Sequence, residues 1–390
     1  MSTWNESTIG EISNYINRGF SPKYVENDGE IIINQKCIRD GRIDFTLARL
    51  TDSAKTITAE KILHFGDIVI NSTGVGTAGR VGIFTSKFKA TADSHVSIIR
   101  INKNRAEPFF IFYNLRQRES DIEGFAEGST GQIELGRERI KTIDILLPPL
   151  PEQRAIAAVL FSFDDKIDLL HRQNKTLEAM AETLFRQWFV EEADKDCKED
   201  SLLELIEIIG GGTPKTSIPD YWDGNVPWLS GGDIASNHKS FVLNTEKYIT
   251  ETGLINSSSK LLPKYATVIS ARGTVGKYCL LARPMAFSQS NYGILPKIDN
   301  CYFFSYLLIN HVVEELQSSA YGSVFDTITT ATFKEIKLQI PSEPEIRSFE
   351  ISISSYFNKI LQNMEQIRTL EKLRDTLLPK LMSGEVRVAV

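Results

Sequence analysis

The sequence predicts an α+β protein in which two similar mixed domains alternate with two long helices that pair as an antiparallel coiled coil. Two observations support this prediction: the chain repeats itself at an offset of about 193 residues, and each copy ends in a long heptad pattern of apolar residues. The predicted segments are a first mixed domain at 1–150, a helix at 151–192, an acidic linker at 193–200, a second mixed domain at 201–340, a helix at 341–385 and a tail at 386–390.

The repeat is clearest where each mixed domain gives way to its helix. Ile140–Arg154 matches Phe333–Arg347 at a constant offset of 193, and the same register continues along the helices. Further upstream the offset slips, for instance to 194 when Gly79–Gly82 is set against Gly273–Gly276. Insertions in surface loops produce small slips of this kind between equivalent copies.

Each mixed domain is predicted to contain short strands and one helix. Short β-branched runs that are bounded by Gly, Pro or polar residues indicate strands. The clearest runs are Asp67–Ile70, Ser97–Ile101, Ile143–Leu147 and Thr267–Ser270. One helix per copy is expected around Pro108–Arg118 and Tyr302–Glu315.

The two long helices are predicted from apolar residues that recur at spacings of four and three, which is typical of a coiled-coil seam. The prolines at 148, 149 and 151 end the preceding strand, and Glu152 stands in the first turn, where the helix dipole favours an anion. The predicted seam consists of Ile156, Leu160, Phe163, Ile167, Leu170, Asn174, Leu177 and Leu184 in the first copy, and of Phe349, Ile353, Tyr356, Ile360, Asn363, Ile367, Leu370, Arg374 and Leu377 in the second.

Each seam contains one asparagine, Asn174 in the first copy and Asn363 in the second. A lone buried Asn can fix the register of two helices at some cost in stability. The alternative is that both residues lie where the seam is splayed and open to water. The sequence leaves these two interpretations open.

The composition is that of an ordinary globular chain, with 42% hydrophobic and 24% charged residues. It contains no stretch of 18 or more uncharged apolar residues, and the start Met1–Glu6 lacks the basic and apolar regions of a signal peptide, so we expect a cytoplasmic protein. The cysteines Cys37, Cys197, Cys279 and Cys301 are scattered. Reduced thiols are therefore expected, rather than a zinc site or a disulfide framework.

The charge of the chain is unevenly distributed. The net charge is −6, and residues 151–200 alone carry 7 basic and 12 acidic groups. Phosphate neutralisation is usually the largest sequence-independent contribution to nucleic-acid affinity, so this balance argues against tight DNA binding by the chain alone. The acidic segment indicates a surface that faces a partner, and DNA binding by the mixed domains would need help from a basic partner.

Several motifs, in the same order in both copies, resemble the specificity subunits of Type I restriction-modification systems. The second copy contains Gly211–Pro214, Tyr221-Trp222, Val226–Trp228, Asp233-Ile234, Arg272–Gly276, Gln289–Asn291 and Gly322–Phe325. The first copy keeps Gly128–Gln132 and Leu147–Gln153, but at its opening only Gly19 and Ser21-Pro22.

The resemblance implies a DNA-binding specificity subunit with two target recognition domains. Each would read one half of a bipartite sequence in double-stranded DNA, and the helices would set the spacing of the half-sites and dock two methyltransferase subunits. Restriction and translocase subunits would join this complex. S-adenosylmethionine, ATP and magnesium would then belong to the partner subunits, with no cofactor in this chain.

The alternative is an enzyme, either a fused or a stand-alone DNA methyltransferase or nuclease. An amino-methyltransferase needs Asp or Asn before Pro-Pro and an aromatic residue, whereas the pair Pro148-Pro149 follows Leu147. Gly74–Gly79 spells a dinucleotide fingerprint, but a strand is expected after it where a helix is required, so we predict a turn. No catalytic, cofactor-binding or metal-binding residue is predicted. A protein that binds a partner other than DNA is a third possibility.

Base reading in the major groove requires polar side chains on loops, while other basic residues contact phosphates. The predicted DNA-binding candidates in the first copy are Lys23, Lys36, Arg39, Arg42, Asn71, Thr73, Arg80 and His95. In the second copy they are Lys215, Thr216, Ser270, Arg272, Lys277, Gln289 and Asn291. Trp222 and Trp228 are expected to anchor the core or a loop.

Overall fold

A computed structural model describes residues 4–52, 57–127, 133–193, 198–321 and 327–389 of the chain. The chain forms two compact units, of which unit 1 is Met1–Ile167 with Leu370–Val390 and unit 2 is Asp168–Thr369. Each unit therefore contains one mixed domain and part of both long helices. The motifs Gly128–Gln132 and Gly322–Phe325, and Cys197, lie outside the described residues.

Unit 1 is built around two four-stranded sheets. The first has the order β2-β11-β8-β9, all antiparallel, with β2 at Ser13–Arg18, β11 at Val96–Ile101, β8 at Ile68–Asn71 and β9 at Val81–Ile83. The second has the order β10-β4-β7-β3, with β10 at Ala90–Ala92, β4 at Gly29–Ile33, β7 at Arg49–Asp52 and β3 at Tyr24–Val25. Within it β10 and β4 run parallel, so their carboxyl ends meet at one edge.

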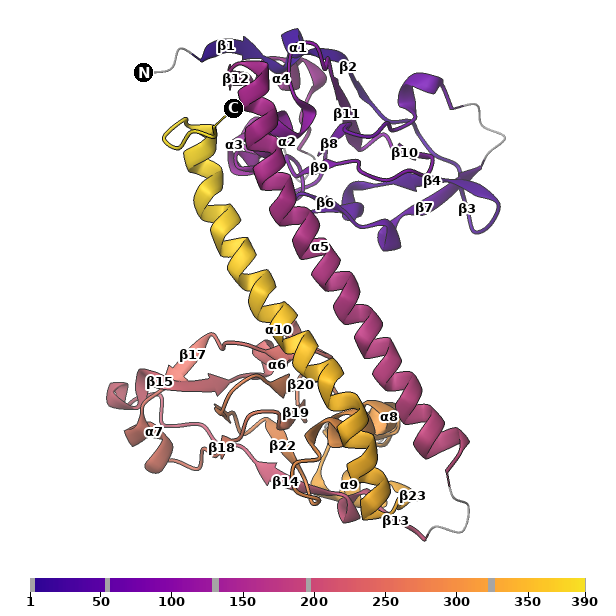
Figure 1. The fold of residues 1–390 in the computed structure, drawn as a ribbon, viewed down its shortest axis with the longest axis vertical. Helices are drawn as coiled ribbons and strands as arrows, with labels where there is room; N and C mark the ends of the chain where they lie inside the picture. Colours follow the sequence, from indigo (N-terminus) through magenta and orange to yellow (C-terminus); the bar gives the residue numbers. More distant parts are fainter. Residues whose placement is uncertain (1–3, 53–56, 128–132, 194–197, 322–326, 390) are drawn as a thin grey trace. The chain divides into compact units, whose positions relative to one another are not determined.

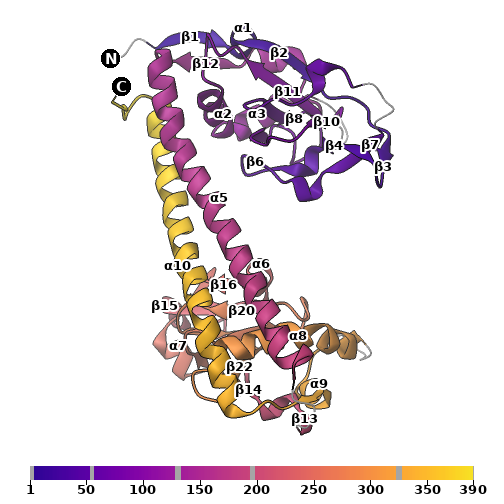
Figure 2. The ribbon, with the colours of Figure 1, turned by 45° about the vertical axis from the view of Figure 1, so that its right-hand side comes forward.

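The helix predicted around Pro108–Arg118 is confirmed as α2, Pro108–Arg116. It packs between the first sheet and the first of the two long helices (Figure 2). Shorter elements complete the domain, namely β1 (Asn5–Thr8), α1 (Ile9–Ile12), β5 (Ile38–Arg39), β6 (Arg42–Ile43), α3 (Glu119–Glu123), α4 (Arg137–Lys141) and β12 (Asp144–Leu147). The strand β1 pairs with β12.

Unit 2 repeats this arrangement. One sheet has the order β14-β22-β19-β20-β16, formed by Ile206–Gly210, Asn291–Pro296, Thr267–Ser270, Tyr278–Leu281 and Phe241–Val242. The other has the order β17-β15-β21-β18, formed by Lys247–Ile249, Trp222–Leu229, Met285–Phe287 and Leu261–Leu262, with β15 and β21 parallel. The pair β13 (Glu199–Ser201) and β23 (Lys337–Gln339) corresponds to β1 and β12.

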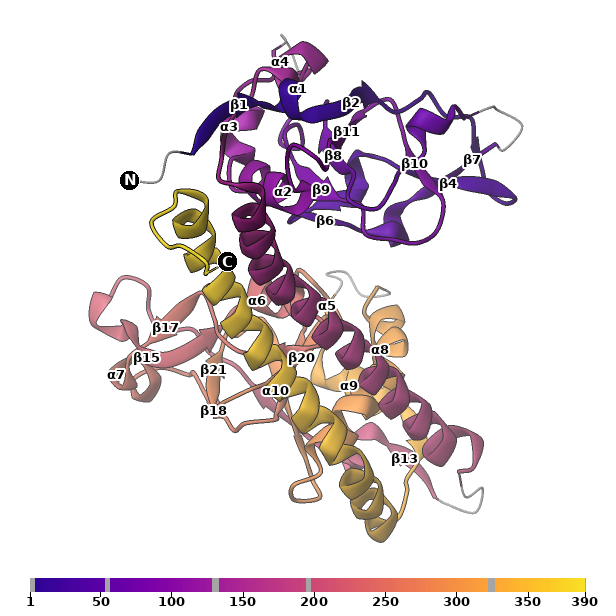
Figure 3. The same cartoon turned by 45° about the horizontal axis from the view of Figure 1, so that its top comes forward.

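The helices of the second mixed domain are α6 (Gly231–Ser236), α7 (Glu251–Ile255), α8 (Tyr302–Tyr321) and α9 (Thr330–Glu335). The predicted helix at Tyr302–Glu315 is confirmed as α8, which continues to Tyr321 because its apolar residues pack into the core of unit 2. Figure 3 shows α8 beside the second half of the first long helix.

Backbone hydrogen bonds within the two copies correct the predicted alignment of Gly79–Gly82 with Gly273–Gly276. The N–H of Gly79 donates to Asn71 O at 2.8 Å, and the N–H of Gly276 donates to Ser270 O at 2.9 Å. Gly79 and Gly276 both have a positive φ, of 84° and 78°. Gly79 is therefore equivalent to Gly276 and not, as predicted, to Gly273. The loop is two residues longer in the first copy, which sequence matching alone could not place.

The two predicted long helices are confirmed as α5, Leu150–Arg186, and α10, Glu343–Met382, with a π-helical turn at Gln187–Glu191 after α5. They pair in antiparallel order, because Asp164 contacts Arg374 in unit 1 while Asn174 contacts Asn363 in unit 2 (Figure 1). Most of the predicted seam is buried. Phe163, Leu177, Leu184, Tyr356, Leu370 and Leu377 are half-buried at its margin.

The two seam asparagines contact each other. Asn363 Nδ2 donates to Asn174 Oδ1 at 2.8 Å and to Gln173 Oε1 at 2.9 Å, and both asparagines are buried. A shift of one helix along the other would separate these groups and leave them buried without partners. The pairing therefore supports the register-setting interpretation over an open, hydrated seam.

In unit 1 the seam of the long helices contains a cluster of charged and hydrogen-bonded side chains. Arg374 Nη1 donates to Asp164 Oδ1 at 2.7 Å, Tyr113 Oη donates to Asp164 Oδ2 at 2.7 Å, and Arg116 lies 3.2 Å from the same carboxylate. This group, here called the Asp164 cluster, joins α2 to both long helices. At the position equivalent to Asp164, unit 2 has Phe357, whose ring stacks on Phe303 at a centroid distance of 4.6 Å.

The helix α8 begins at a buried carboxylate. Glu350 of α10 accepts hydrogen bonds from the backbone N–H groups of Phe303 and Phe304 at 3.1 and 2.8 Å. These are first-turn N–H groups that have no partner within their own helix. Burial raises the pKa of Glu350 to about 7, although the two backbone donors act in the opposite direction.

This raised pKa predicts that the chain loses stability as the pH rises from 4.5 to 7. The folded state keeps a proton on Glu350 in this window while the unfolded state, with an ordinary pKa of 4.5, has released it. The free energy of unfolding should therefore fall by up to about 3 kcal/mol across the window. Urea denaturation at several pH values measures this slope.

The matched variants are Glu350→Gln, which keeps a hydrogen-bond acceptor but cannot titrate, and Glu365→Gln, an exposed glutamate of the same helix. Glu350→Gln should reduce the slope and leave the part that comes from Glu178, whose pKa burial also raises to about 7, while Glu365→Gln should leave the slope unchanged. Identical slopes for the unmodified chain and Glu350→Gln would show that Glu350 does not hold the proton.

Candidate nucleic-acid interface

In unit 1, three loops meet beside the carboxyl ends of the parallel strands β4 and β10. The N–H of Asp93 donates to Ile33 O at 2.9 Å, and the N–H of Ser72 donates to His95 O at 2.8 Å. Asn71 Nδ2 donates to Gln35 O at 2.9 Å. These bonds tie residues 34–37, 72–80 and 93–95 into one surface, which we call the first loop cluster.

Unit 2 contains the same construction. The N–H of Ser288 donates to Leu229 O at 2.9 Å, and the N–H of Ala271 donates to Ser290 O at 3.0 Å. Residues 230–236, 271–277 and 288–290 therefore form a second loop cluster, with its backbone bonds at the positions equivalent to those of the first. Because the backbone contacts recur and the side chains differ, the two clusters present different chemistry on the same frame.

The structure brings several predicted DNA-binding candidates together in these clusters. In the first cluster Lys36 and His95 are exposed, and Thr73 and Arg80 are half-buried. In the second cluster Arg272 and Gln289 are exposed and Lys277 is half-buried. Arg80 and Lys277 are structural equivalents. The N–H of Asn71 donates to Arg80 O at 2.9 Å, and the N–H of Ser270 donates to Lys277 O at 2.7 Å.

Three of the loop candidates do not lie on loops, and one of them, Ser270, was also predicted to end the strand Thr267–Ser270. Asn71 and Ser270 end the strands β8 and β19, Asn291 begins β22, and all three are buried. Cross-strand pairs Asn71 with Val96 and Ser270 with Asn291 extend the sheets to these positions. The expected loop placement is therefore wrong. These side chains are buried at the strand ends from which the loops begin or at which they end.

The remaining candidates lie outside the clusters. Lys23 pairs with Asp52 at 2.9 Å, and Arg39 and Arg42 lie on the β5-β6 hairpin. Lys215 and Thr216 are exposed in the segment before Trp222.

The two tryptophans are anchors, as predicted. Trp228 Nε1 donates to Gly212 O at 3.0 Å and Trp222 Nε1 to Lys215 O at 3.2 Å. Their rings meet edge to face with centroids 5.3 Å apart.

The sequence did not indicate Gln35. Its side chain lies in the first loop cluster, where Oε1 accepts from Thr73 Oγ1 at 3.3 Å. Asn34 caps the short turn Gln35–Cys37, and a capping Asn before a turn was the available signal.

The Gly74–Gly79 segment forms the predicted turn. It connects β8 to the strand β9, so no helix follows that could face a pyrophosphate. Gly74 has a φ of 102°, and a Cβ there would lie 2.4 Å from Thr77 Oγ1. This glycine lets the loop pass close to Thr77 and Gln35.

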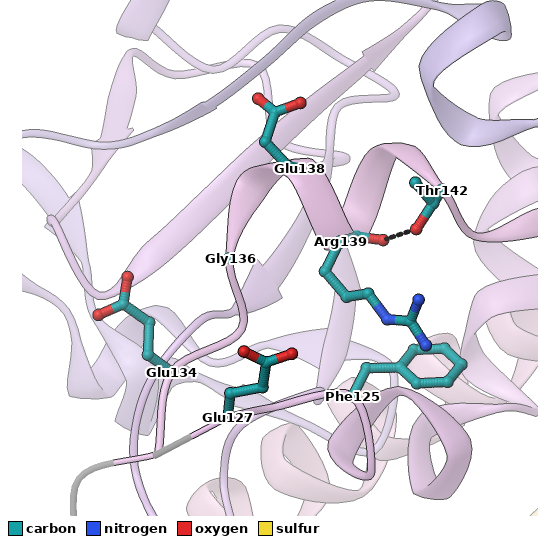
Figure 4. Close-up of a pocket in the computed structure, with 7 residues that line it drawn as sticks. All are labelled: Phe125, Glu127, Glu134, Gly136, Glu138, Arg139 and Thr142. Atoms are coloured by element: carbon teal, nitrogen blue, oxygen red, sulfur yellow. Dashed lines mark hydrogen bonds between the residues drawn. The ribbon is translucent and has the colours of Figure 1, made fainter.

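Beside the first loop cluster lies an acidic hollow of about 540 Å³, shown in Figure 4. Glu127, Glu134 and Glu138 line it, and the Arg139 guanidinium lies 4.3 Å from the centroid of the Phe125 ring. Carboxylates repel phosphate, so this hollow does not extend a phosphate-binding surface. Among the described residues, no group of three or more His, Cys, Asp or Glu could hold a metal ion.

A second surface lies on the long helices. In unit 2 an apolar groove of about 600 Å³ runs between α5 and α10, lined by Lys175, Thr176, Ala179, Met180, Thr183, Leu184 and Tyr356. At the offset of 193, unit 1 has Leu373 for Met180, Leu377 for Leu184 and Phe163 for Tyr356. Met180 and Leu373 are 44% and 46% exposed. We call the groove of unit 2, and the surface formed by these three equivalent residues of unit 1, the helix grooves.

The cysteines within the described residues, Cys37, Cys279 and Cys301, are free and buried. Burial raises the pKa of each thiol, which keeps the protonated, unreactive form. No helix in the described part of the chain is long and apolar enough to cross a membrane.

Comparisons with known proteins agree with this construction. The family model of the Type I restriction modification DNA specificity domain matches residues 1–179 and 194–373. The chain is similar to the Type I restriction enzyme HindI specificity subunit of Haemophilus influenzae, with 23% identity over 99% of this chain and 100% of that protein. It is also similar to the MjaVIII specificity subunit of Methanocaldococcus jannaschii, with 24% identity over 99% and 93%.

A solved structure shares the fold. The Type I restriction-modification S subunit from M. genitalium superposes with a TM-score of 0.68 and 18% identity, over 97% of this chain and 96% of that one. The predicted α+β fold with two repeated domains and paired long helices is confirmed by this likeness and by the elements described above.

Proposed function

Because this chain belongs to the Type I restriction modification DNA specificity family, we propose that it reads a bipartite sequence in double-stranded DNA, with each loop cluster reading one half. The observation that carries this proposal is the recurrence of one loop frame with different side chains. A repeated frame predicts the same docking mode on DNA, and different side chains predict different bases. The predicted boundaries 1–150 and 201–340 of the recognition domains belong to this proposal.

The chain acts as a non-catalytic subunit in this proposal. Two methyltransferase subunits dock on the two helix grooves, which recur at equivalent positions and so suit two copies of one partner. Restriction and translocase subunits join them, and S-adenosylmethionine, ATP and magnesium are bound by these partners. The net charge of −6 supports this division, because basic partner surfaces would add the phosphate contacts that this chain lacks. Such a complex works in the cytoplasm, where the DNA lies.

Arg272 provides the test of DNA reading. It is exposed in the second loop cluster, and a guanidinium can donate two hydrogen bonds to guanine O6 and N7. Cells that express the chain with the methyltransferase subunit of its own system should show a split N6-methyladenine motif by single-molecule sequencing. Arg272→Ala should relax the motif at one base pair, a guanine position, by roughly tenfold.

The control is Lys260→Ala, an exposed residue of unit 2 outside the second loop cluster. It should leave the motif unchanged. If the unmodified chain gives no split motif while the partner is active on other DNA, the proposed function is wrong. If Arg272→Ala weakens methylation equally at all sites, Arg272 contacts phosphate and reads no base.

A further inference from the structure

In the first loop cluster three side chains form a chain of hydrogen bonds that ends at an exposed imidazole. His95 Nδ1 lies 2.8 Å from Thr73 Oγ1, and Thr73 Oγ1 lies 3.3 Å from Gln35 Oε1. Each residue comes from a different loop of the cluster. Although the histidine is exposed, one of its two ring nitrogens is therefore held within the protein.

The direction of these bonds follows from the chemistry of the groups. Gln35 Oε1 can only accept, so the single hydroxyl proton of Thr73 points toward it. Thr73 Oγ1 must then accept from His95, which places a hydrogen on Nδ1. In a neutral imidazole with Nδ1–H, the other nitrogen, Nε2, has a free lone pair and is an acceptor.

The backbone holds this arrangement in place. The N–H of His95 donates to the buried carboxylate of Asp93 at 2.9 Å, and the N–H of Ser72, next to Thr73, donates to His95 O at 2.8 Å. Gly74 permits the close approach, since a Cβ there would lie 3.2 Å from Gln35 Oε1. The orientation of the ring is thus set before any ligand arrives, which lowers the entropic cost of binding.

The second loop cluster lacks this chain of bonds. By the backbone hydrogen bonds, Gly231 is equivalent to Gln35, Arg272 to Thr73 and Ser290 to His95. The second cluster presents a permanently charged donor where the first presents an imidazole ring whose Nδ1 is held by Thr73. The two clusters are therefore suited to opposite hydrogen-bonding edges.

We propose that His95 is a specificity-determining residue whose Nε2 accepts a hydrogen bond from an exocyclic amino group, adenine N6 or cytosine N4, in the major groove. Thr73 and Gln35 are positioning residues that set its tautomer. This inference rests on the proposed function, because it requires that the first loop cluster contacts DNA. Adenine N6 and cytosine N4 are the amino donors in the major groove, and guanine and thymine present acceptors there.

The test is the split methylation motif of the full chain with its methyltransferase partner, for His95→Ala, Thr73→Val and Thr73→Ser. His95→Ala should relax one position of the half-site read by unit 1 by roughly tenfold, and the identity of that position, A or C, distinguishes the two amino groups. Thr73→Val keeps the shape but removes the hydroxyl, and should relax the same position by a smaller factor. Thr73→Ser keeps the hydroxyl and should preserve the motif.

The outcomes separate this inference from the function on which it rests. If the unmodified chain gives no split motif, the proposed function fails and the inference fails with it. If the unmodified chain gives a motif that His95→Ala leaves intact, the inference alone is wrong. A uniform loss of methylation at all sites would place His95 on a phosphate and would also overturn it. Thermal denaturation of each variant identifies a loss that comes from unfolding, and Thr73→Val then tests the proposal without altering the ring.

Discussion

Replacing Arg374 with alanine is expected to lower the free energy of unfolding by about 3–5 kcal/mol. The Arg374 side chain is 9% exposed and the Asp164 side chain is 15% exposed, so neither charge is well solvated. Without Arg374, the carboxylate keeps Tyr113 and Arg116 but loses its 2.7 Å partner on α10. The loss arises because a poorly solvated carboxylate then keeps only one of its two guanidinium partners, Arg116. Urea denaturation measures it.

A matched control is available on the same helix. Arg347 pairs with Glu343 at 2.7 Å, but the two side chains are 46% and 59% exposed. Arg347→Ala should therefore cost at most about 0.5 kcal/mol. The double variant Asp164→Leu/Arg374→Leu should recover only part of the loss, because it removes the carboxylate together with its α10 partner but leaves Arg116 and Tyr113 without their acceptor. Equal losses for Arg347→Ala and Arg374→Ala would refute the view that burial gives the Asp164 cluster its importance.

The Asp164 cluster also marks what sequence reasoning could and could not provide. The heptad pattern is local, so it predicted both long helices and placed Arg374 in the seam. The partner of Arg374 lies 210 residues away and depends on which part of α5 meets which part of α10. Periodicity predicts that two helices pack together, but only the packed structure shows which residues meet at a given level of the seam.

The loop clusters were partly predictable for a similar reason. Polar and basic residues near turn signals predicted His95, Thr73 and Arg272, which do lie in the clusters. Asn71, Ser270 and Asn291 were chosen as loop candidates because they are polar. Strand ends are decided by cross-strand hydrogen bonds, as in the pairs Asn71 with Val96 and Ser270 with Asn291. A single sequence does not contain that information.

Gln35 was missed because its role depends on a contact across 38 residues, from the turn after β4 to the loop after β8. No local pattern distinguishes a glutamine that orients a histidine from one that is merely solvated. The predicted alignment of Gly79 with Gly273 was wrong for a related reason. The loop differs by two residues between the copies, so the similar motifs align in the sequence at positions that are not equivalent in the structure. Elements defined by short-range periodicity were predicted well, whereas side-chain partnerships between distant segments required the fold.

Lysine at both Met180 and Leu373 is expected to abolish methylation, the largest functional effect predicted for this chain. In the proposed complex each helix groove is covered by a methyltransferase subunit, so a lysine there would be buried without a partner. A charge that is buried in an interface without a partner costs about 2–5 kcal/mol of binding free energy, which weakens binding by roughly 30-fold or more at each groove. Native mass spectrometry of the purified complex counts the methyltransferase subunits directly.

Because the two helix grooves are equivalent, the single and double variants should differ in the number of methyltransferase subunits bound. Met180→Lys alone and Leu373→Lys alone should each leave one groove intact and give complexes with one methyltransferase subunit, while the double variant should give none. Ile351→Lys is the control, because Ile351 is 78% exposed on α10 and its equivalent at the offset of 193 is Ala158, so it belongs to no repeated groove. Two subunits bound to a folded double variant would place the partner elsewhere, whereas loss of both subunits in either single variant would mean that the two grooves are filled cooperatively. Only a chain with two equivalent docking sites can give the graded series of two, one and none, so the stoichiometry tests whether the internal repeat extends from the fold to the partners.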